Sequence, residues 1–120
     1  MRESDVEKVC DRHAEAYGYR VVRLSQRRRS GVHPGLPDRR YQGKRGAFFF
    51  EVKAADGKLS RDQFAFLLAE IEGGNLASCG GVLELGELLS TLVKAPRNAM
   101  AVCRKHIQVW AGHGFRAEAA

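Results

Sequence analysis

Two short runs of strand-forming residues, joined by a tight turn, constrain the fold of this chain more than any other feature. The runs are Asp38–Gln42 and Ala47–Ala54, and the intervening residues 43–46 read Gly-Lys-Arg-Gly, a composition that favours a turn. The second run is rich in aromatic residues, which are common in strands. The pattern predicts a β-hairpin whose register places Asp38 directly across from Glu51.

The predicted hairpin brings charged side chains together on one face. Side chains opposite each other on paired strands have Cβ atoms about 4.5–5.5 Å apart, and alternation along the strand puts Lys53 on the same face as Glu51. Like charges so close destabilise a sheet, unless a cation lies between the Asp38 and Glu51 carboxylates. Hard oxygen ligands suit Mg²⁺ or Mn²⁺.

This arrangement predicts a site for phosphodiester hydrolysis. A metal held by Asp38 and Glu51 would lower the pKa of a bound water and polarise a phosphoryl oxygen. The Lys53 ammonium would orient the attacking water and offset charge developing on the phosphate. The alternative is that Glu51 and Lys53 form a surface ion pair and that Asp38 only begins a turn after Pro37.

The remaining segments predict an α/β domain with a small mixed β-sheet flanked by helices. Capping boxes at Ser4/Glu7 and Ser60/Gln63 indicate two helix starts, and the length of 120 residues fits a single domain. The order α-β-β-β-α-β-α-β follows, with no structure assigned to Lys94–Arg104 and a frayed tail expected at Arg116–Ala120. The further predicted elements are helices at Ser4–Tyr17, Ser60–Glu72 and Glu87–Val93, and strands at Tyr19–Leu24, Gly80–Leu85 and His106–Trp110.

Positive charge is concentrated in the part of the chain around Asp38. The net charge is +6, and nine Lys or Arg residues lie between Arg20 and Arg45, where Asp38 is the only acidic residue. This concentration favours binding to a phosphate backbone over a merely solvated loop. It fits a non-catalytic DNA- or RNA-binding module equally well. The residues expected to contact nucleic acid are Arg27, Arg28, Arg29, Arg39, Arg40, Lys44 and Arg45.

Cysteine content and hydropathy favour a cytoplasmic protein with no membrane association. Apolar runs are far shorter than the ~20 residues of a membrane span, and the charged N-terminus does not resemble a secretory signal. Three scattered cysteines do not form a disulfide framework. Cys10 and His13, and likewise Cys103 and His106, have the spacing of zinc ligands, but the two pairs are far apart in sequence. Buried thiols are the favoured interpretation.

Three motifs occur in an order and spacing that identify a family. They are Gly35-Leu36-Pro37-Asp38, then Phe50-Glu51-Val52-Lys53, then Leu59-Ser60-Arg61-Asp62-Gln63. Together they resemble the VRR-NUC family, the virus-type replication-repair nuclease branch of the PD-(D/E)XK superfamily. The resemblance covers about residues 4–85 and leaves 86–120 as a C-terminal extension.

The resemblance implies a restriction-endonuclease-like core and a Mg²⁺- or Mn²⁺-dependent DNA endonuclease. Stand-alone members resemble Holliday junction resolvases, which implies a homodimer acting on branched DNA in repair or recombination, without a small-molecule cofactor. Sequence-specific restriction is less favoured, because 120 residues leave no room for a recognition domain.

The resemblance also implies roles for individual residues. Asp38, Glu51 and the Val52 backbone carbonyl become metal ligands, and Lys53 becomes the catalytic lysine. Gln63 matches a glutamine that supports the site or touches nucleic acid, a role compatible with its capping box.

Glu7 matches a first-helix glutamate at the edge of the metal site. Capping of the helix would explain Glu7 equally well.

Overall fold

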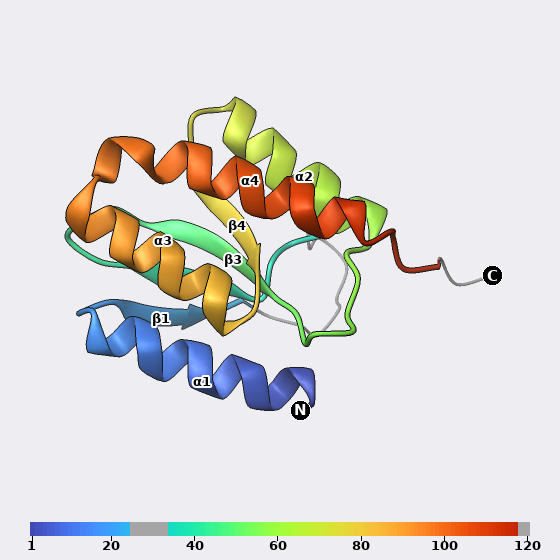
Figure 1. The fold of residues 1–120 in the computed structure, drawn as a ribbon, viewed down its shortest axis with the longest axis horizontal. Helices are drawn as coiled ribbons and strands as arrows, with labels where there is room; N and C mark the ends of the chain where they lie inside the picture. Colours follow the sequence, from blue (N-terminus) through green and yellow to red (C-terminus); the bar gives the residue numbers. More distant parts are fainter. Residues whose placement is uncertain (25–33, 118–120) are drawn as a thin grey trace.

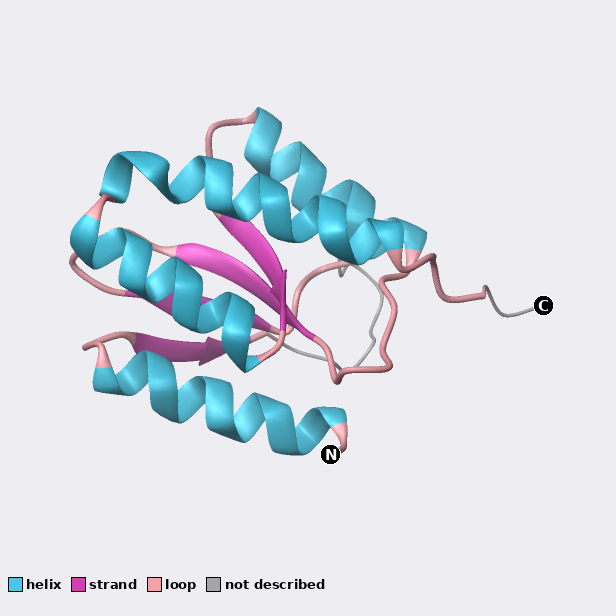
Figure 2. Cartoon of the chain, in the orientation of Figure 1, coloured by secondary structure: helices cyan, strands magenta, loops and turns pink. Residues whose placement is uncertain are grey.

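The computed structural model describes residues 1–24 and 34–117, which form helices around a four-stranded sheet (Figure 1, Figure 2). The α/β class with a small mixed sheet flanked by helices is confirmed, and the first six elements follow the predicted order α-β-β-β-α-β. In chain order the elements are α1 (Glu3–Ala16), β1 (Arg20–Arg23), β2 (Arg39–Gln42), β3 (Phe48–Val52), α2 (Arg61–Glu72), β4 (Ala77–Gly80), α3 (Val82–Lys94), the short 3-10 helix η1 (Pro96–Asn98) and α4 (Ala99–Gly112).

The sheet has the strand order β1-β2-β3-β4. The first two pairings are antiparallel, and β4 runs parallel to β3. Arg39 pairs with Phe50 and Tyr41 with Phe48, so the predicted hairpin register is confirmed. One residue beyond the Arg39–Phe50 pair, this register leads to Asp38 and Glu51.

Helices cover both sides of the sheet. The Tyr41 hydroxyl of β2 donates a hydrogen bond to Asp11 of α1, whereas the Phe49 ring of β3, on the opposite face, packs against Phe66 of α2 with ring centroids 5.3 Å apart. Helix α3 packs against α1, and α4 packs against α2 and along β4 (Figure 1). The core between these layers includes Tyr41, Phe48 and Phe50, all fully buried.

The strand predicted at Gly80–Leu85 is wrong. Strand β4 ends at Gly80, and the following residues begin α3, which joins that segment to the helix predicted at Glu87–Val93. The helix buries one stripe of leucines with helical spacing, namely Leu85, Leu88, Leu89 and Leu92. Gly86 lies between these two predicted elements, and a Cβ at Gly86 would lie 3.1 Å from His13 Cε1, so the glycine allows close approach of α1.

The strand predicted at His106–Trp110 is also wrong, because this segment belongs to α4. Its buried residues are Ala99, Cys103, His106, Ile107 and Trp110, again at helical spacing. The unassigned segment Lys94–Arg104 contains the end of α3, η1 and the start of α4. Within the described ranges, no helix has the length and apolar character needed to span a membrane.

Candidate metal centre

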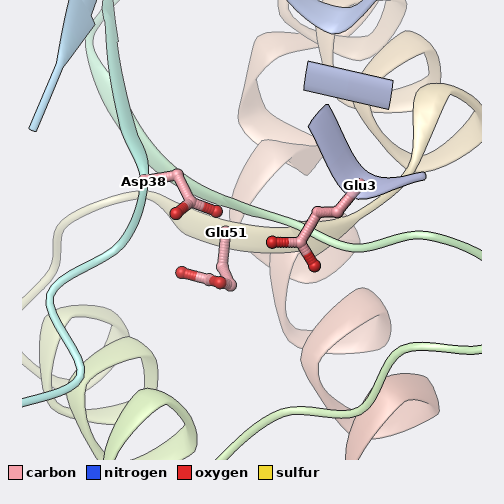
Figure 3. A group of neighbouring side chains, drawn as sticks. All are labelled: Glu3, Asp38 and Glu51. Carbon is pink, nitrogen blue, oxygen red and sulfur yellow. The ribbon is translucent and has the colours of Figure 1, made fainter. Parts of the chain in front are cut away.

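Three carboxylates converge at one end of the sheet. Asp38 immediately precedes β2, Glu51 lies near the end of β3, and Glu3 lies in the first turn of α1. One carboxylate oxygen from each lies within 4.8 Å of the others, and Figure 3 shows the three side chains directed toward a common point. Asp38 and Glu51 therefore share one face, as the hairpin register predicted.

Asp38 is held by the backbone of the neighbouring strand. The Val52 N–H donates to Asp38 Oδ2 at 3.1 Å. The N–H and C=O of a strand residue point toward the same neighbour, so the Val52 carbonyl is directed to the same side of β3 as Asp38. Continuing the register by two residues from the Arg39–Phe50 pair leads to Pro37 opposite Val52. Proline has no N–H, so Pro37 cannot supply the usual ladder hydrogen bond to this carbonyl.

Glu51 is a buried carboxylate with incomplete hydrogen bonding. Its residue is 2% exposed. Its Oε2 accepts a hydrogen bond from Gln63 Nε2 at 3.0 Å and lies 3.4 Å from Lys53 Nζ, whereas Oε1 has no hydrogen-bond partner among the described residues. Burial, and then the neighbouring Asp38 carboxylate, raise the pKa of Glu51 well above its ordinary value. A buried, unpaired carboxylate oxygen is costly, and a cation would satisfy it.

Lys53 lies beside this pair of carboxylates. The side chain is 4% exposed, and its ammonium is ion-paired with Glu51. Gly57 allows the loop after β3 to close over the lysine, since a Cβ at Gly57 would lie 3.3 Å from Lys53 Cδ. Lys53 is therefore fixed in place on the face that carries Glu51.

Gln63 caps α2 and also contacts Glu51. Its backbone N–H donates to Ser60 Oγ at 3.0 Å, and its Oε1 accepts from the Ser60 N–H at 2.8 Å, which completes the capping box of α2. Its Nε2 remains free to donate to Glu51. The cap of α2 thus orients the amide that holds the buried carboxylate.

The conformation and surroundings of Gly35 explain why the Gly-Leu-Pro-Asp motif begins with a glycine. Its φ is +77°, and a Cβ there would lie 2.1 Å from the Asp62 backbone oxygen. Only glycine tolerates both the left-handed conformation and this close approach. The loop leading to Asp38 is consequently docked on the first turn of α2, which carries Gln63.

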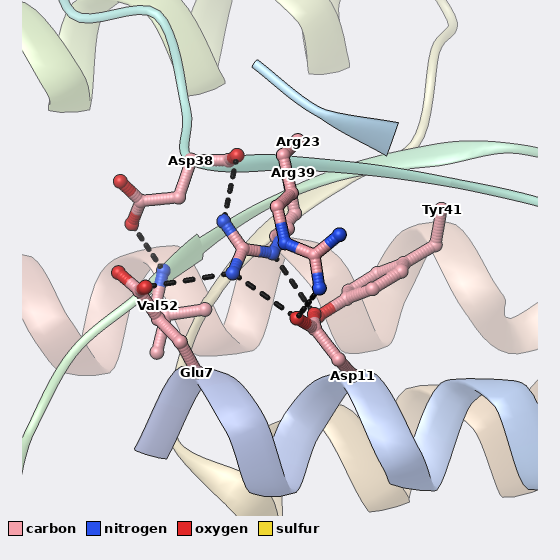
Figure 4. Close-up of polar contacts among 7 residues, drawn as sticks. All are labelled: Glu7, Asp11, Arg23, Asp38, Arg39, Tyr41 and Val52. Atoms are coloured by element: carbon pink, nitrogen blue, oxygen red, sulfur yellow. Dashed lines mark hydrogen bonds and ion pairs between the residues drawn. The ribbon is translucent and has the colours of Figure 1, made fainter. Parts of the chain in front are cut away.

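Glu3 was missed by the sequence reasoning, which selected Glu7. The structure places Glu7 Oε1 3.4 Å from Arg39 Nη2, at the border of the cluster (Figure 4). Glu3 lies one helical turn earlier on the same side of α1, so the i, i+4 spacing of the two glutamates was the available signal. Burial is the main cause that raises the pKa of both Glu3 and Glu7.

A buried ion-pair network fixes α1 on the sheet, and it too was missed. Asp11 is 5% exposed and accepts hydrogen bonds from Arg39 Nε at 2.9 Å, from Arg39 Nη2 at 3.1 Å and from the Tyr41 hydroxyl at 2.9 Å. Arg23 Nη2 adds a bond at 3.3 Å, and Arg39 Nη1 also donates to the Asp38 backbone carbonyl (Figure 4). Arg39 was expected to contact nucleic acid, but its guanidinium is buried and already bonded, so this expectation needs correction.

The structure describes three of the other basic residues predicted to contact nucleic acid, namely Arg40, Lys44 and Arg45, and none of the three contacts the carboxylate cluster in the described structure. Arg27, Arg28 and Arg29 lie outside the described residues. The Arg40 guanidinium lies over the Phe49 ring, 4.5 Å from its centroid. Lys44 and Arg45 are exposed in the hairpin turn, at the end of the strands opposite to Asp38.

The Cys-x-x-His pairs do not form a zinc site among the described residues. Cys10, Cys79 and Cys103 are free and buried. His106 is engaged between the Ser78 hydroxyl and the Glu87 carboxylate, at 2.7 and 2.8 Å. Within the described part of the chain, the group of three convergent ligands is the one formed by Glu3, Asp38 and Glu51.

No protein-family model, curated protein or solved structure matches this chain. The three motifs that resemble the VRR-NUC family are nevertheless placed together in space, since the Gly35 loop, the end of β3 and the start of α2 are in mutual contact. Their juxtaposition is a property of the fold and is independent of any relative.

Proposed function

We propose that this protein is a metal-dependent DNA endonuclease of the VRR-NUC type, with a restriction-endonuclease-like core. One observation carries the proposal: the buried Glu51 carboxylate has an oxygen with no donor among the described residues, and this oxygen belongs to a cluster of three carboxylates. Such a cluster is stable when a divalent cation supplies the missing positive charge.

The donor set fits Mg²⁺ or Mn²⁺. Both ions prefer oxygen ligands, and the residues that would hold the ion are Asp38, Glu51, Glu3 and the Val52 carbonyl. When bound, the ion would supply Lewis acidity toward a phosphoryl oxygen and a water of lowered pKa. Among the residues that the structure describes, Lys53 is the one basic side chain ion-paired within the cluster, which leaves a net negative charge for the ion to balance.

The chain's own residues have distinct roles in this proposal. Lys53 orients the attacking water and offsets the charge that develops on the scissile phosphate. Gln63 holds Glu51 in one orientation through the hydrogen bond to Oε2. Glu7 lies at the edge of the cluster, where its ion pair with Arg39 links the metal ligands to the buried network around Asp11.

DNA is the proposed substrate. The net charge of +6 favours a polyanion, and a small nuclease without a separate reading domain recognises shape and backbone charge. Branched DNA such as a Holliday junction, cut by a homodimer that presents two sites, follows from the family resemblance.

A cleavage assay tests the proposal. The purified protein is incubated with linear, flapped, forked and four-way DNA in Mg²⁺, in Mn²⁺ and in EDTA. Cleavage is expected with either ion and not with EDTA, and fastest on the four-way junction. Equal cleavage rates on all substrates would contradict the preference for junctions but not the nuclease activity. Binding without cleavage in any divalent ion would favour the alternative of a non-catalytic binding module.

The Asp38→Asn variant separates these two functions. We expect it to lose cleavage by at least about 100-fold and to bind DNA as tightly as wild type or more tightly, because a negative charge facing the phosphates is removed.

A further inference from the structure

The C-terminal segment packs beside the proposed metal centre. The Arg116 N–H donates to the Leu59 carbonyl at 2.8 Å, and Phe115 forms a parallel bridge with Leu59. The Phe115 ring also packs against Phe64 of α2, with centroids 5.3 Å apart. Residues 115–116, which we call the strap, therefore run along the loop that connects Lys53 to α2. The frayed tail expected at Arg116–Ala120 is therefore wrong for Arg116, and residues 118–120 lie outside the described residues.

The strap gathers three basic side chains on that loop. The Arg61 guanidinium lies over the Phe115 ring, 4.8 Å from its centroid. The Lys58 ammonium lies next to Gly114, and Arg116 is close enough to Glu3 for its charge to lower the pKa of that carboxyl, against the larger effect of burial. Lys58, Arg61 and Arg116 are exposed, and none forms an ion pair with a described residue.

We propose that Lys58, Arg61 and Arg116 form a phosphate clamp, assembled by the strap, that binds the nucleic-acid backbone next to the metal centre. The inference rests on the proposed function and extends it to residues to which the family resemblance assigns no role and which lie outside the basic stretch around Asp38. The partner is identified by charge, since three exposed cations beside the proposed metal centre would bind backbone phosphates.

Electrostatics explain why such a clamp is needed. Three carboxylates repel an approaching phosphate backbone, so cations must lie at the mouth of the site to bring it within reach. Arg39 is buried, and Lys44 and Arg45 are at the far end of the hairpin. The basic residues on the strap and on the loop beneath it are exposed and form no ion pair with a described residue.

Phe115 gives the clamp its geometry. Its ring holds the Arg61 guanidinium through a cation–π contact and anchors the strap on Phe64. Phe115→Ala therefore removes no charge but releases both Arg61 and Arg116, and we expect weaker DNA binding from this variant as well.

The test is the salt dependence of DNA binding. A short fluorescent duplex is titrated with protein in EDTA, so that no cleavage occurs, and the observed binding constant is measured at several salt concentrations. Arg116→Ala should lower the slope of log K against log salt by about 1, as loss of one phosphate contact requires, and Arg61→Ala should do the same. Arg116→Lys should restore the slope.

The matched control is Arg97→Ala. Arg97 is exposed and lies in η1, and the connection between α3 and α4 is at the end of the molecule opposite to the C-terminal segment (Figure 1). Its removal should leave the slope unchanged. The clamp is overturned if Arg116→Ala, shown to be folded by its thermal unfolding, has the same slope and affinity as Arg97→Ala.

The same data separate the clamp from the nuclease proposal. If the variants give the expected slopes but the wild-type protein never cuts DNA in Mn²⁺, the clamp is supported and the nuclease proposal is wrong. If the wild-type protein cuts DNA and Arg116→Ala leaves the slope and the affinity unchanged, only the clamp is wrong.

Discussion

Gln63 Nε2 donates a hydrogen bond to Glu51 Oε2 at 3.0 Å, joining the first turn of α2 to the end of β3. The same side chain closes the capping box with Ser60, so the helix start and the orientation of the carboxylate depend on one residue. With Oε2 engaged by Gln63 and Lys53, the other oxygen of Glu51 remains for a cation.

Gln63→Ala should weaken Mn²⁺ binding by about 10–100-fold, the usual effect of removing a hydrogen bond to a metal ligand. Ser60→Ala is the matched control, because it removes the cap at a cost of about 1 kcal/mol in the free energy of unfolding and leaves the amide of Gln63 in place. Calorimetric titration with Mn²⁺ and urea unfolding of both variants provide the comparison. Equal losses of Mn²⁺ affinity in the two variants would show that Gln63 acts only through the helix cap.

Lys53→Met should lower the rate of DNA cleavage by at least about 100-fold without weakening Mn²⁺ binding. The substitution removes the cation that offsets phosphate charge, but it leaves all three carboxylates, and one positive charge less beside them favours the metal. Single-turnover cleavage rates and a Mn²⁺ titration measure the two effects. Lys8→Met, an exposed position on α1, serves as the control and should cleave as wild type does.

The metal-free protein should lose stability as the pH rises from acidic to neutral values. Burial raises the pKa of Glu51, Glu3 and Glu7 above the ordinary value of 4.5, so the native state holds protons that the unfolded chain releases. The destabilisation therefore begins above the unfolded pKa and is complete once the pH exceeds the raised folded pKa. Mn²⁺, which requires deprotonated carboxylates, should reverse it.

Thermal unfolding of the chelated protein between about pH 5 and pH 8 checks this dependence. Glu51→Gln should have a shallower decline than wild type, since its side chain has no proton to lose. A wild-type midpoint that declines over this range no more steeply than that of Glu51→Gln would rule out a raised pKa for Glu51.

Gly35→Ala should be among the most destabilising glycine substitutions. Gly46→Ala is the control, because Gly46 also has positive φ, at +113°, but a Cβ there would meet nothing within 4 Å. In the control, the free energy of unfolding should fall by about 1–2 kcal/mol, because alanine is strained in the left-handed conformation. In Gly35→Ala the free energy of unfolding should fall by roughly 1–3 kcal/mol more, the usual cost of overpacking, because the added Cβ overlaps the Asp62 backbone.

Urea unfolding measures both glycine variants. If Gly35→Ala also displaces the loop before Asp38, its Mn²⁺ affinity falls while that of Gly46→Ala does not. Equal stabilities for the two variants would show that the loop is not docked on α2.

The parts of the fold that local signals determine were predictable from the sequence. The hairpin register followed from the turn length and the strand alternation around Glu51, and the capping box at Ser60 marked the start of α2. These are short-range relationships, in which neighbouring residues carry the whole signal.

The C-terminal third was harder because its pattern is ambiguous locally. The run from Gly80 to Leu85 is apolar enough for a strand, and only its continuation to Leu92 reveals a period of 3.6. Gly86 lies inside this helix, and the reason for a glycine there, the close approach of His13 of α1, lies far away in sequence.

The missed site residues have the same cause. Glu3 and Asp11 gain their roles from packing of α1 against β2 and β3, which no local pattern specifies. Arg39 is charged and lies in a basic stretch, so it was expected at the surface. Only its ion pair with the buried carboxylate of Asp11 makes its burial favourable.

The binding of Mn²⁺ to the metal-free protein, followed by isothermal titration calorimetry, is the most direct test of the carboxylate cluster. Wild type should bind the ion with release of protons, while Glu51→Gln and Asp38→Asn should bind it at least about 10-fold more weakly. Glu3→Gln should also weaken binding, and more than Glu7→Gln does. Undiminished Mn²⁺ binding in Glu51→Gln would contradict a metal centre at this end of the sheet, and with it the proposed hydrolysis.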